Sequence, residues 1–192
     1  MQAADFNAGW AYRHLDADED WTAVTIPHDA MLYEPRHALA ASGLNSGWFE
    51  GRDYEYVKHF MPERDMAGSR MLLEFEGVYH HAEVWVNGEK AAFRPYGYTN
   101  FYVDLTDRVR FGEDNEIRVI ARNADQPNSR WYSGAGIYRP VTLWTSPAEH
   151  IAVDGLFVRT IAADPANGTA RIRVEVETTA AGSVHIEIAD MA

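Results

Sequence analysis

Apolar and polar side chains alternate with a period of two along several short segments of the chain. Met71, Leu73 and Phe75 share one face of such a segment, and Glu74 and Glu76 share the other. Because successive side chains of a strand point to opposite sides, this period predicts strands with one buried and one solvated face. The same pattern predicts further strands over residues 54–60, 82–87, 98–105, 116–122 and 141–145.

Turn signals separate these segments. Asn87-Gly88 is the dipeptide typical of a type I′ hairpin, and Gly77 to His80 join the strand before it to the strand around Phe75. Short strands at this spacing predict an all-β fold, a β-sandwich or jelly roll. The first fifty residues are less regular, and the segment from Pro35 to Ala41 is expected to form one helical turn.

A proline interrupts the strand pattern at Ser146-Pro147-Ala148, and a new apolar run begins at Ile151. We therefore predict one domain over residues 1–147 and a second over 148–192. Alternation over 171–177 and 184–188 leaves room for about three strands in the second domain. Since an immunoglobulin-like sandwich needs about seven strands, we interpret residues 148–192 as the truncated start of such a domain.

Composition excludes several classes of function. The formal net charge of −12 argues against nucleic acid and anionic membranes as partners, and the absence of cysteine excludes disulfides and thiolate metal sites. His80 and His81 would point to opposite faces of a strand, so no metal site is expected. The sequence has no phosphate-binding glycine loop, so no cofactor is expected. With no signal peptide and no span of about 20 apolar residues, a cytoplasmic location is expected.

Several motifs together resemble the amino-terminal sugar-binding domain of family 2 glycoside hydrolases. The most specific is Arg130-Trp131-Tyr132-Ser133-Gly134-Ala135-Gly136-Ile137-Tyr138-Arg139, a shaped glycine loop that leads into a strand. Other matching segments are Ile26-Pro27-His28-Asp29-Ala30-Met31, Gly47-Trp48-Phe49-Glu50-Gly51, Phe75-Glu76-Gly77-Val78, the Val84 to Gly88 hairpin segment, Gly97-Tyr98-Thr99 and Asn115-Glu116-Ile117.

The resemblance implies a galactose-binding-like jelly roll, followed in the family by an immunoglobulin-like domain and a catalytic barrel. It further implies a retaining glycosidase in which a pair of barrel glutamates act as acid/base and nucleophile. A barrel of about 250 residues does not fit this chain, so no catalytic residue is assigned here and the chain alone is expected to be inactive. Its role would be that of a scaffold and a wall of the substrate pocket.

Four residues are expected to contact the substrate. The resemblance implies an Asn and an Asp that reach the sugar, and Asn45 is the candidate for the first. Arg130 stands where the Asp is expected without a gap, and a short loop adjustment would place Ser129 or Asn128 there instead. Trp131 offers a flat apolar face to a pyranose ring. For Asn45, Asn128 and Arg130 the alternative is local turn chemistry, and for Trp131 it is packing against a neighbouring domain.

The expected partner is a β-galactoside, and a homo-oligomer is an open alternative to a monomer. The Pro-His-Asp-Ala-Met and Trp-Tyr-Ser-Gly-Ala-Gly segments favour a β-galactosidase, with β-glucuronidase and β-mannosidase as alternatives of the same architecture. A free-standing carbohydrate-binding module or lectin is the alternative from another class, since fold alone does not separate the two.

Overall fold

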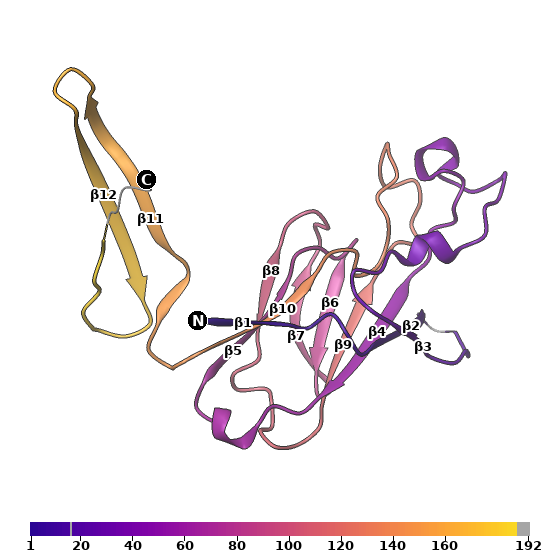
Figure 1. The fold of residues 1–192 in the computed structure, drawn as a ribbon. Coiled ribbons are helices and arrows are strands. Elements are labelled where there is room, and N and C mark those ends of the chain that lie inside the picture. Colours follow the sequence, from indigo (N-terminus) through magenta and orange to yellow (C-terminus); the bar gives the residue numbers. More distant parts are fainter. Residues whose placement is uncertain (16, 188–192) are drawn as a thin grey trace. The chain divides into compact units, whose positions relative to one another are not determined.

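The computed structural model of the chain is all-β and describes residues 1–15 and 17–187. It divides into two compact units, residues 2–145 and residues 146–192 together with Met1. The larger unit is a β-sandwich of a four-stranded and a six-stranded sheet (Figure 1). This architecture confirms the predicted all-β, galactose-binding-like fold class.

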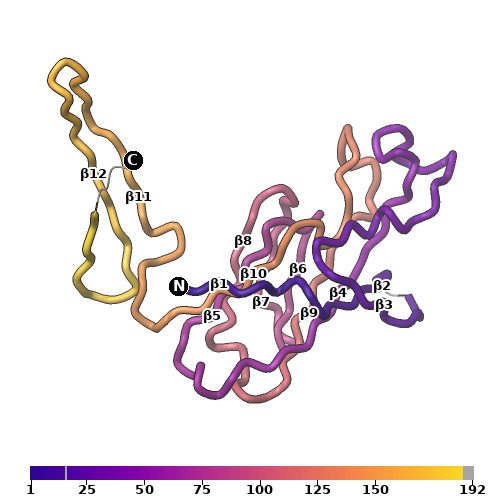
Figure 2. Tube along the Cα trace, in the orientation of Figure 1, coloured from indigo at the N-terminus to yellow at the C-terminus, as the bar shows by residue number. Residues whose placement is uncertain are grey.

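The four-stranded sheet has the order β1-β10-β5-β8, in which β1 pairs antiparallel with β10 and β5 pairs antiparallel with β8. Its strands are β1 (Gln2–Asp5), β10 (Val141–Ser146), β5 (Arg70–Phe75) and β8 (Phe101–Asp104). The two ends of the sandwich sequence meet here, because β1 pairs with β10 along its whole length, as the tube in Figure 2 also shows.

The six-stranded sheet has the order β3-β2-β4-β9-β6-β7. Its strands are β3 (Thr22–Val24), β2 (Trp10–His14), β4 (Tyr54–Phe60), β9 (Asn115–Ala121), β6 (Ala82–Val86) and β7 (Glu89–Arg94). Asn87 and Gly88 both have positive φ between β6 and β7, so the expected hairpin is confirmed. In contrast, β5 and β6 do not form a hairpin, since residues 76–81 carry the chain from one sheet to the other.

The core lies between the two sheets and is built from the apolar faces that the alternation predicts. Along β6 the side chains of Ala82, Val84 and Val86 are buried and those between them are half-buried. Trp10 lies at the centre of an aromatic group, with edge contacts to Phe6 and Phe75 at ring-centroid distances of 6.3 and 6.4 Å. Large buried rings of this kind dominate the apolar surface removed from water on folding.

Three short 3-10 helices lie outside the sheets: η1 (Ala30–Tyr33), η2 (Gly43–Ser46) and η3 (Arg64–Met66). The prediction of a helical turn over 35–41 is wrong. The turn begins earlier, at η1, because the side chain of Asp29 accepts a hydrogen bond from the backbone NH of Met31 and caps that helix. Residues 35–41 instead include a β-bridge from Arg36 to Phe49 and a turn. No helix in the described ranges is long and apolar enough to cross a membrane.

The second unit is a two-stranded antiparallel ribbon of β11 (Ile151–Asp164) and β12 (Thr169–Thr178). The expected strand around Val184 and Ile186 is absent from residues 182–187, and Ile188 lies outside the described residues. A strand is stabilised by its ladder partner, and no described residue pairs with 182–187. The assignment of residues 148–192 to an immunoglobulin-like domain stays a prediction.

Candidate functional site

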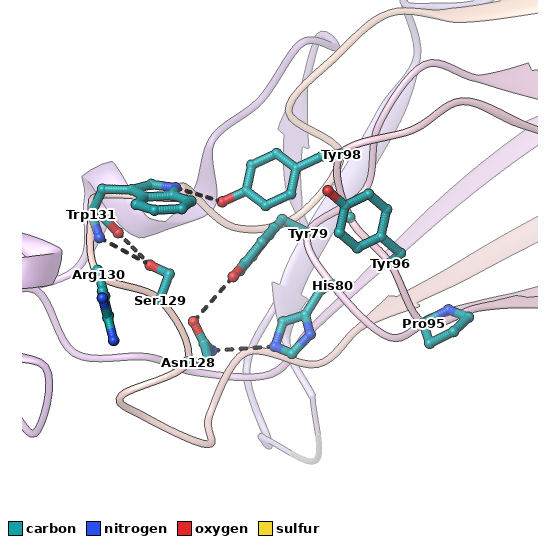
Figure 3. Close-up of a pocket in the computed structure, with 10 residues that line it drawn as sticks. Tyr79, His80, Pro95, Tyr96, Tyr98, Asn128, Ser129, Arg130 and Trp131 are labelled. Carbon is teal, nitrogen blue, oxygen red and sulfur yellow. Dashed lines mark hydrogen bonds between the residues drawn. The ribbon is translucent and has the colours of Figure 1, made fainter.

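A pocket of about 520 Å³ opens where three connecting segments of the sandwich unit meet. Its walls come from residues 79–80, 95–98 and 128–131 (Figure 3). Two backbone hydrogen bonds between Tyr79 and Gly136, each with an N···O distance of 2.9 Å, form an antiparallel bridge. They hold residues 79–80 against the loop that follows residues 128–131. The pocket therefore depends on the glycine loop that the sequence motif contains.

Aromatic rings make up one side of this pocket. Trp131 is 60% exposed, and its indole Nε1 donates a hydrogen bond to the Tyr98 hydroxyl at 2.9 Å. The Tyr98 ring makes edge contacts with Tyr79 and Tyr96 at centroid distances of 5.2 and 5.6 Å. The indole is thus anchored through its polar edge while much of its surface stays accessible, which suits contact with the apolar face of a sugar.

Asn128 closes the opposite side through a network of hydrogen bonds. The Tyr79 hydroxyl donates to Asn128 Oδ1 at 3.2 Å, and Asn128 Nδ2 donates to Asn123 Oδ1 at 2.7 Å and to His80 Nε2 at 3.2 Å. Burial, together with the neighbouring His81, lowers the pKa of His80, so this ring is neutral and can accept. The amide hydrogens of Asn128 are therefore used within the protein, and a lone pair of Oδ1 is left for a ligand.

Three of the four expected substrate residues meet in this pocket, namely Asn128, Arg130 and Trp131. Arg130 is exposed and makes no hydrogen bond or ion pair with any described residue. Asn45 is not among the lining residues; it is exposed on η2, where its backbone NH bonds Ser42 O at 3.0 Å. Whether these residues bind a sugar stays a prediction.

The sequence interpretation did not assign Tyr79, Tyr96 and Tyr98 to the site, and it considered His80 only as a metal ligand. A usable signal was present in Tyr96-Gly97-Tyr98, where two aromatics flank a glycine at the start of the predicted strand over 98–105. His80 and His81 are not on a strand as expected, since the crossover places them side by side with ring centroids 4.2 Å apart. Across residues 1–15 and 17–187 no group of three or more His, Asp or Glu could hold a metal ion.

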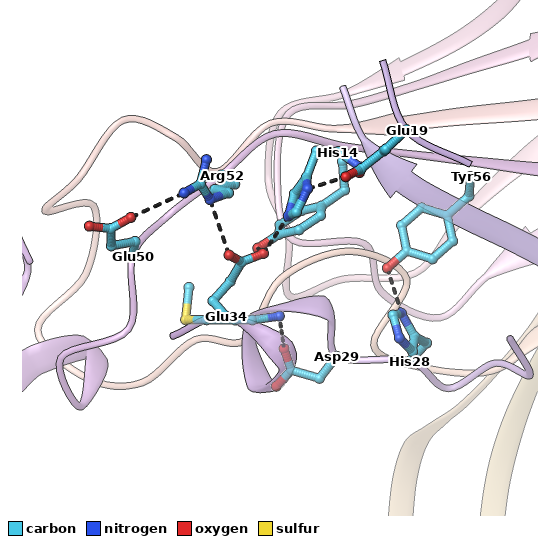
Figure 4. Close-up of polar contacts among 10 residues, drawn as sticks. His14, Glu19, His28, Asp29, Glu34, Glu50, Arg52 and Tyr56 are labelled. Atoms are coloured by element: carbon cyan, nitrogen blue, oxygen red, sulfur yellow. Dashed lines mark hydrogen bonds and ion pairs between the residues drawn. The ribbon is translucent and has the colours of Figure 1, made fainter. Parts of the chain in front are cut away.

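A second polar cluster surrounds the buried carboxylate of Glu34 (Figure 4). Glu34 accepts from His14 Nε2 at 2.6 Å, from the Tyr54 hydroxyl at 3.1 Å and from Arg52 Nε at 3.1 Å. Burial alone would lower the pKa of His14, but its hydrogen bonds to Glu34 and Glu19 outweigh burial and leave the pKa raised. Both oxygens of the carboxylate are bonded within the protein, so the cluster is a structural link between β2, η1 and β4.

Comparison with known proteins places these features in a family. Residues 10–164 match the sequence model described as the glycosyl hydrolase 2 galactose-binding domain-like family. The chain belongs to this family. The predicted resemblance to the amino-terminal sugar-binding domain of family 2 glycoside hydrolases is thereby confirmed.

Named relatives are glycosidases of more than one specificity. Over 172 residues the chain is 38% identical to the β-galactosidase BoGH2A of Bacteroides ovatus, covering 85% of this chain and 20% of that protein. It is 30% identical over 148 residues to a β-glucuronidase of Bacteroides fragilis, covering 71% of the chain and 20% of that protein. The chain thus spans about a fifth of the length of these relatives.

Solved structures agree in fold. A β-glycosidase from Bacteroides vulgatus superposes with a TM-score of 0.82 at 29% identity, over 93% of this chain and 24% of that one. A family 2 glycosyl hydrolase from Bacteroides cellulosilyticus superposes with a TM-score of 0.77 at 26% identity, over 94% of this chain and 29% of that one. The chain therefore shares its fold with part of these two family 2 and β-glycosidase structures.

Proposed function

We propose that the chain is the amino-terminal part of a retaining β-galactosidase-type enzyme and that its pocket forms one wall of the substrate site. The observation that supports this most is Trp131, a large aromatic side chain held at its polar edge by Tyr98 and 60% exposed beside Asn128. Sugar pockets combine such an apolar surface with a small number of fixed polar groups. A pocket with only one such wall would hold a galactoside weakly.

The substrate class is proposed to be a β-galactoside. Support comes from the higher identity to the Bacteroides ovatus β-galactosidase, 38%, than to the Bacteroides fragilis β-glucuronidase, 30%. A glucuronide is the alternative, because Arg130 is a pocket cation that pairs with no described residue and is able to pair with a uronate. Comparing a neutral with an acidic sugar therefore tests the assignment directly.

Catalysis is proposed to take place outside this chain. None of the ten lining residues is an Asp or Glu, whereas retaining hydrolysis needs two carboxyl groups on either side of the scissile bond. The buried carboxylates of Glu34 and Glu55 lie in other places and are bonded to His, Tyr and Arg side chains. The chain alone is expected to bind but not to turn over its substrate.

Binding is tested by titrating the isotope-labelled chain with methyl β-galactoside and with methyl β-glucuronide while amide and indole NMR signals are recorded. We expect shifts at Trp131 and Tyr98 with millimolar affinity for the galactoside, and loss of these shifts in Trp131→Ala. Trp21→Ala, which removes a 40% exposed tryptophan outside the pocket, is the matched control. Preference for the glucuronide would move the assignment to that class, and micromolar affinity would favour a free-standing binding module.

A further inference from the structure

The side chain of Asp29 joins two segments that are far apart in sequence. Its Oδ1 accepts from the backbone NH of Met31 at 3.1 Å and from that of Ala135 at 2.9 Å. Its Oδ2 accepts from the Tyr132 hydroxyl at 2.6 Å. A backbone bond from Ala30 N to Ala135 O at 3.0 Å runs beside these contacts. One carboxylate therefore holds both the start of η1 and the loop that carries the pocket residues.

The local backbone is shaped to admit this carboxylate. Gly134 has φ +71°, and a Cβ at this position would lie 2.9 Å from Asp29 Oδ2. Glycine meets both demands, because it adopts positive φ readily and leaves space for the close approach. The Asp29 contact is thus specified by the glycine of the motif as well as by the acid itself.

Tyr132 is fixed on its other side by a ring contact. Its ring meets Phe49 edge-on at a centroid distance of 6.0 Å, so hydroxyl and ring are held by different segments. The adjacent residue is Trp131, whose backbone is bonded to Ser129 and whose indole is bonded to Tyr98. A displacement of Tyr132 would therefore move Trp131 directly.

We propose that Asp29 and Tyr132 are positioning residues, a clasp that holds the 130–136 loop so that Trp131 stands in the pocket with its indole bonded to Tyr98. The clasp acts on the sugar only through Trp131 and makes no contact with it. Its effect on sugar affinity rests on the proposed function, whereas its effect on the geometry of Trp131 does not. The two effects can be measured separately.

The test compares Tyr132→Phe and Asp29→Asn with the unaltered chain. Tyr132→Phe keeps the ring contact with Phe49 and removes only the hydroxyl, and Asp29→Asn keeps a weaker neutral partner for it. We expect the Trp131 indole NH signal to shift and broaden in Tyr132→Phe, with a smaller change in Asp29→Asn. Galactoside affinity should fall roughly fivefold in Tyr132→Phe, the size of effect typical of residues that act through a neighbour.

Tyr33→Phe is the matched control, because the Tyr33 ring is 71% exposed and its hydroxyl makes no hydrogen bond with any residue that the structure describes. It should leave both the indole signal and the affinity unchanged. An unaltered Trp131 indole signal in a folded Tyr132→Phe chain would overturn the clasp, whatever the sugar result. A shifted indole signal with no sugar binding by any variant would support the clasp and count against the proposed function alone.

Discussion

Gly136 is the position at which one added methyl group should cost most stability. Its φ is +81°, and a Cβ there would lie 2.0 Å from the Tyr56 hydroxyl oxygen and 2.8 Å from Tyr56 Cζ. Tyr56 cannot turn aside, because it is fully buried and its hydroxyl is bonded to His28 Nδ1 at 2.9 Å. Gly88 has almost the same φ, +82°, but nothing lies within 4 Å of its Cβ position, so Gly88→Ala isolates the backbone cost.

The left-handed conformation should cost Gly88→Ala about 1–2 kcal/mol of unfolding free energy. Gly136→Ala should lose the same amount plus about 1–3 kcal/mol for overpacking the core. Removing the clashing oxygen with Tyr56→Phe should recover part of the difference, since the ring carbon at 2.8 Å stays in place. The cost of Gly136→Ala measured in a Tyr56→Phe background is therefore expected to lie between the costs of Gly88→Ala and of Gly136→Ala in the unaltered chain.

Urea unfolding followed by tryptophan fluorescence measures these differences. All six tryptophans of the chain lie within residues 2–145, so the signal reports the sandwich unit and excludes the β11–β12 ribbon. Equal losses in Gly136→Ala and Gly88→Ala would refute the reasoning, because the close approach of Tyr56 would then carry no energetic weight. The slope of unfolding free energy against urea should be unchanged in both variants.

Three further outcomes are expected. Glu55→Gln should cost about 3 kcal/mol of unfolding free energy, because Glu55 is 1% exposed and bonded to two arginines. Glu116 is half-exposed, so Glu116→Gln should cost under about 0.5 kcal/mol. Equal losses of unfolding free energy in urea would contradict this prediction. Because the pKa of His14 is raised, the folded state binds the imidazole proton more tightly than the unfolded state. The contribution of His14 to stability should therefore be complete below pH 6.5 and decline as pH rises through the folded-state pKa. If a His14→Gln chain shows the same pH profile of stability, His14 makes no such contribution. The chain alone should release no nitrophenol from aryl β-galactosides, and activity that follows the purified protein through chromatography would require a carboxylate pair within the sandwich.

Much of the sandwich follows from local sequence. The strand over 54–60 and the turn at Asn87-Gly88 could be predicted because alternation and turn propensity act over a few residues. The 3-10 helices could not be placed in this way, since four residues are too few to show a helical period. For η1 the capping aspartate was the available signal, and it lies outside the segment where the turn was expected.

The pocket depends on contacts that local patterns do not encode. The bridge from Tyr79 to Gly136 brings together segments more than fifty residues apart, and only then do Tyr98, Asn128 and Trp131 become neighbours. Asn128 was predicted because the resemblance implies an Asp near this position, and Trp131 because it lies in the glycine motif and offers a flat apolar face. Asn45 was selected by resemblance within a loop. Differences in loop length shift which residue matches the family position, and the hydrophobic pattern does not reveal such a shift.

The ion triad of Glu55 also acts on how the strands align. Glu55 on β4 lies directly opposite Arg13 on β2 and diagonally from Arg118 on β9. Sliding β4 by one residue would turn its tyrosines to solvent, but sliding it by two would keep every apolar residue on the correct face. Hydrophobic alternation cannot reject that second misalignment. A two-residue slip takes Arg13 out of its place directly opposite Glu55, so this buried carboxylate favours the native β2–β4 register, and its neutral replacement should weaken that preference during folding.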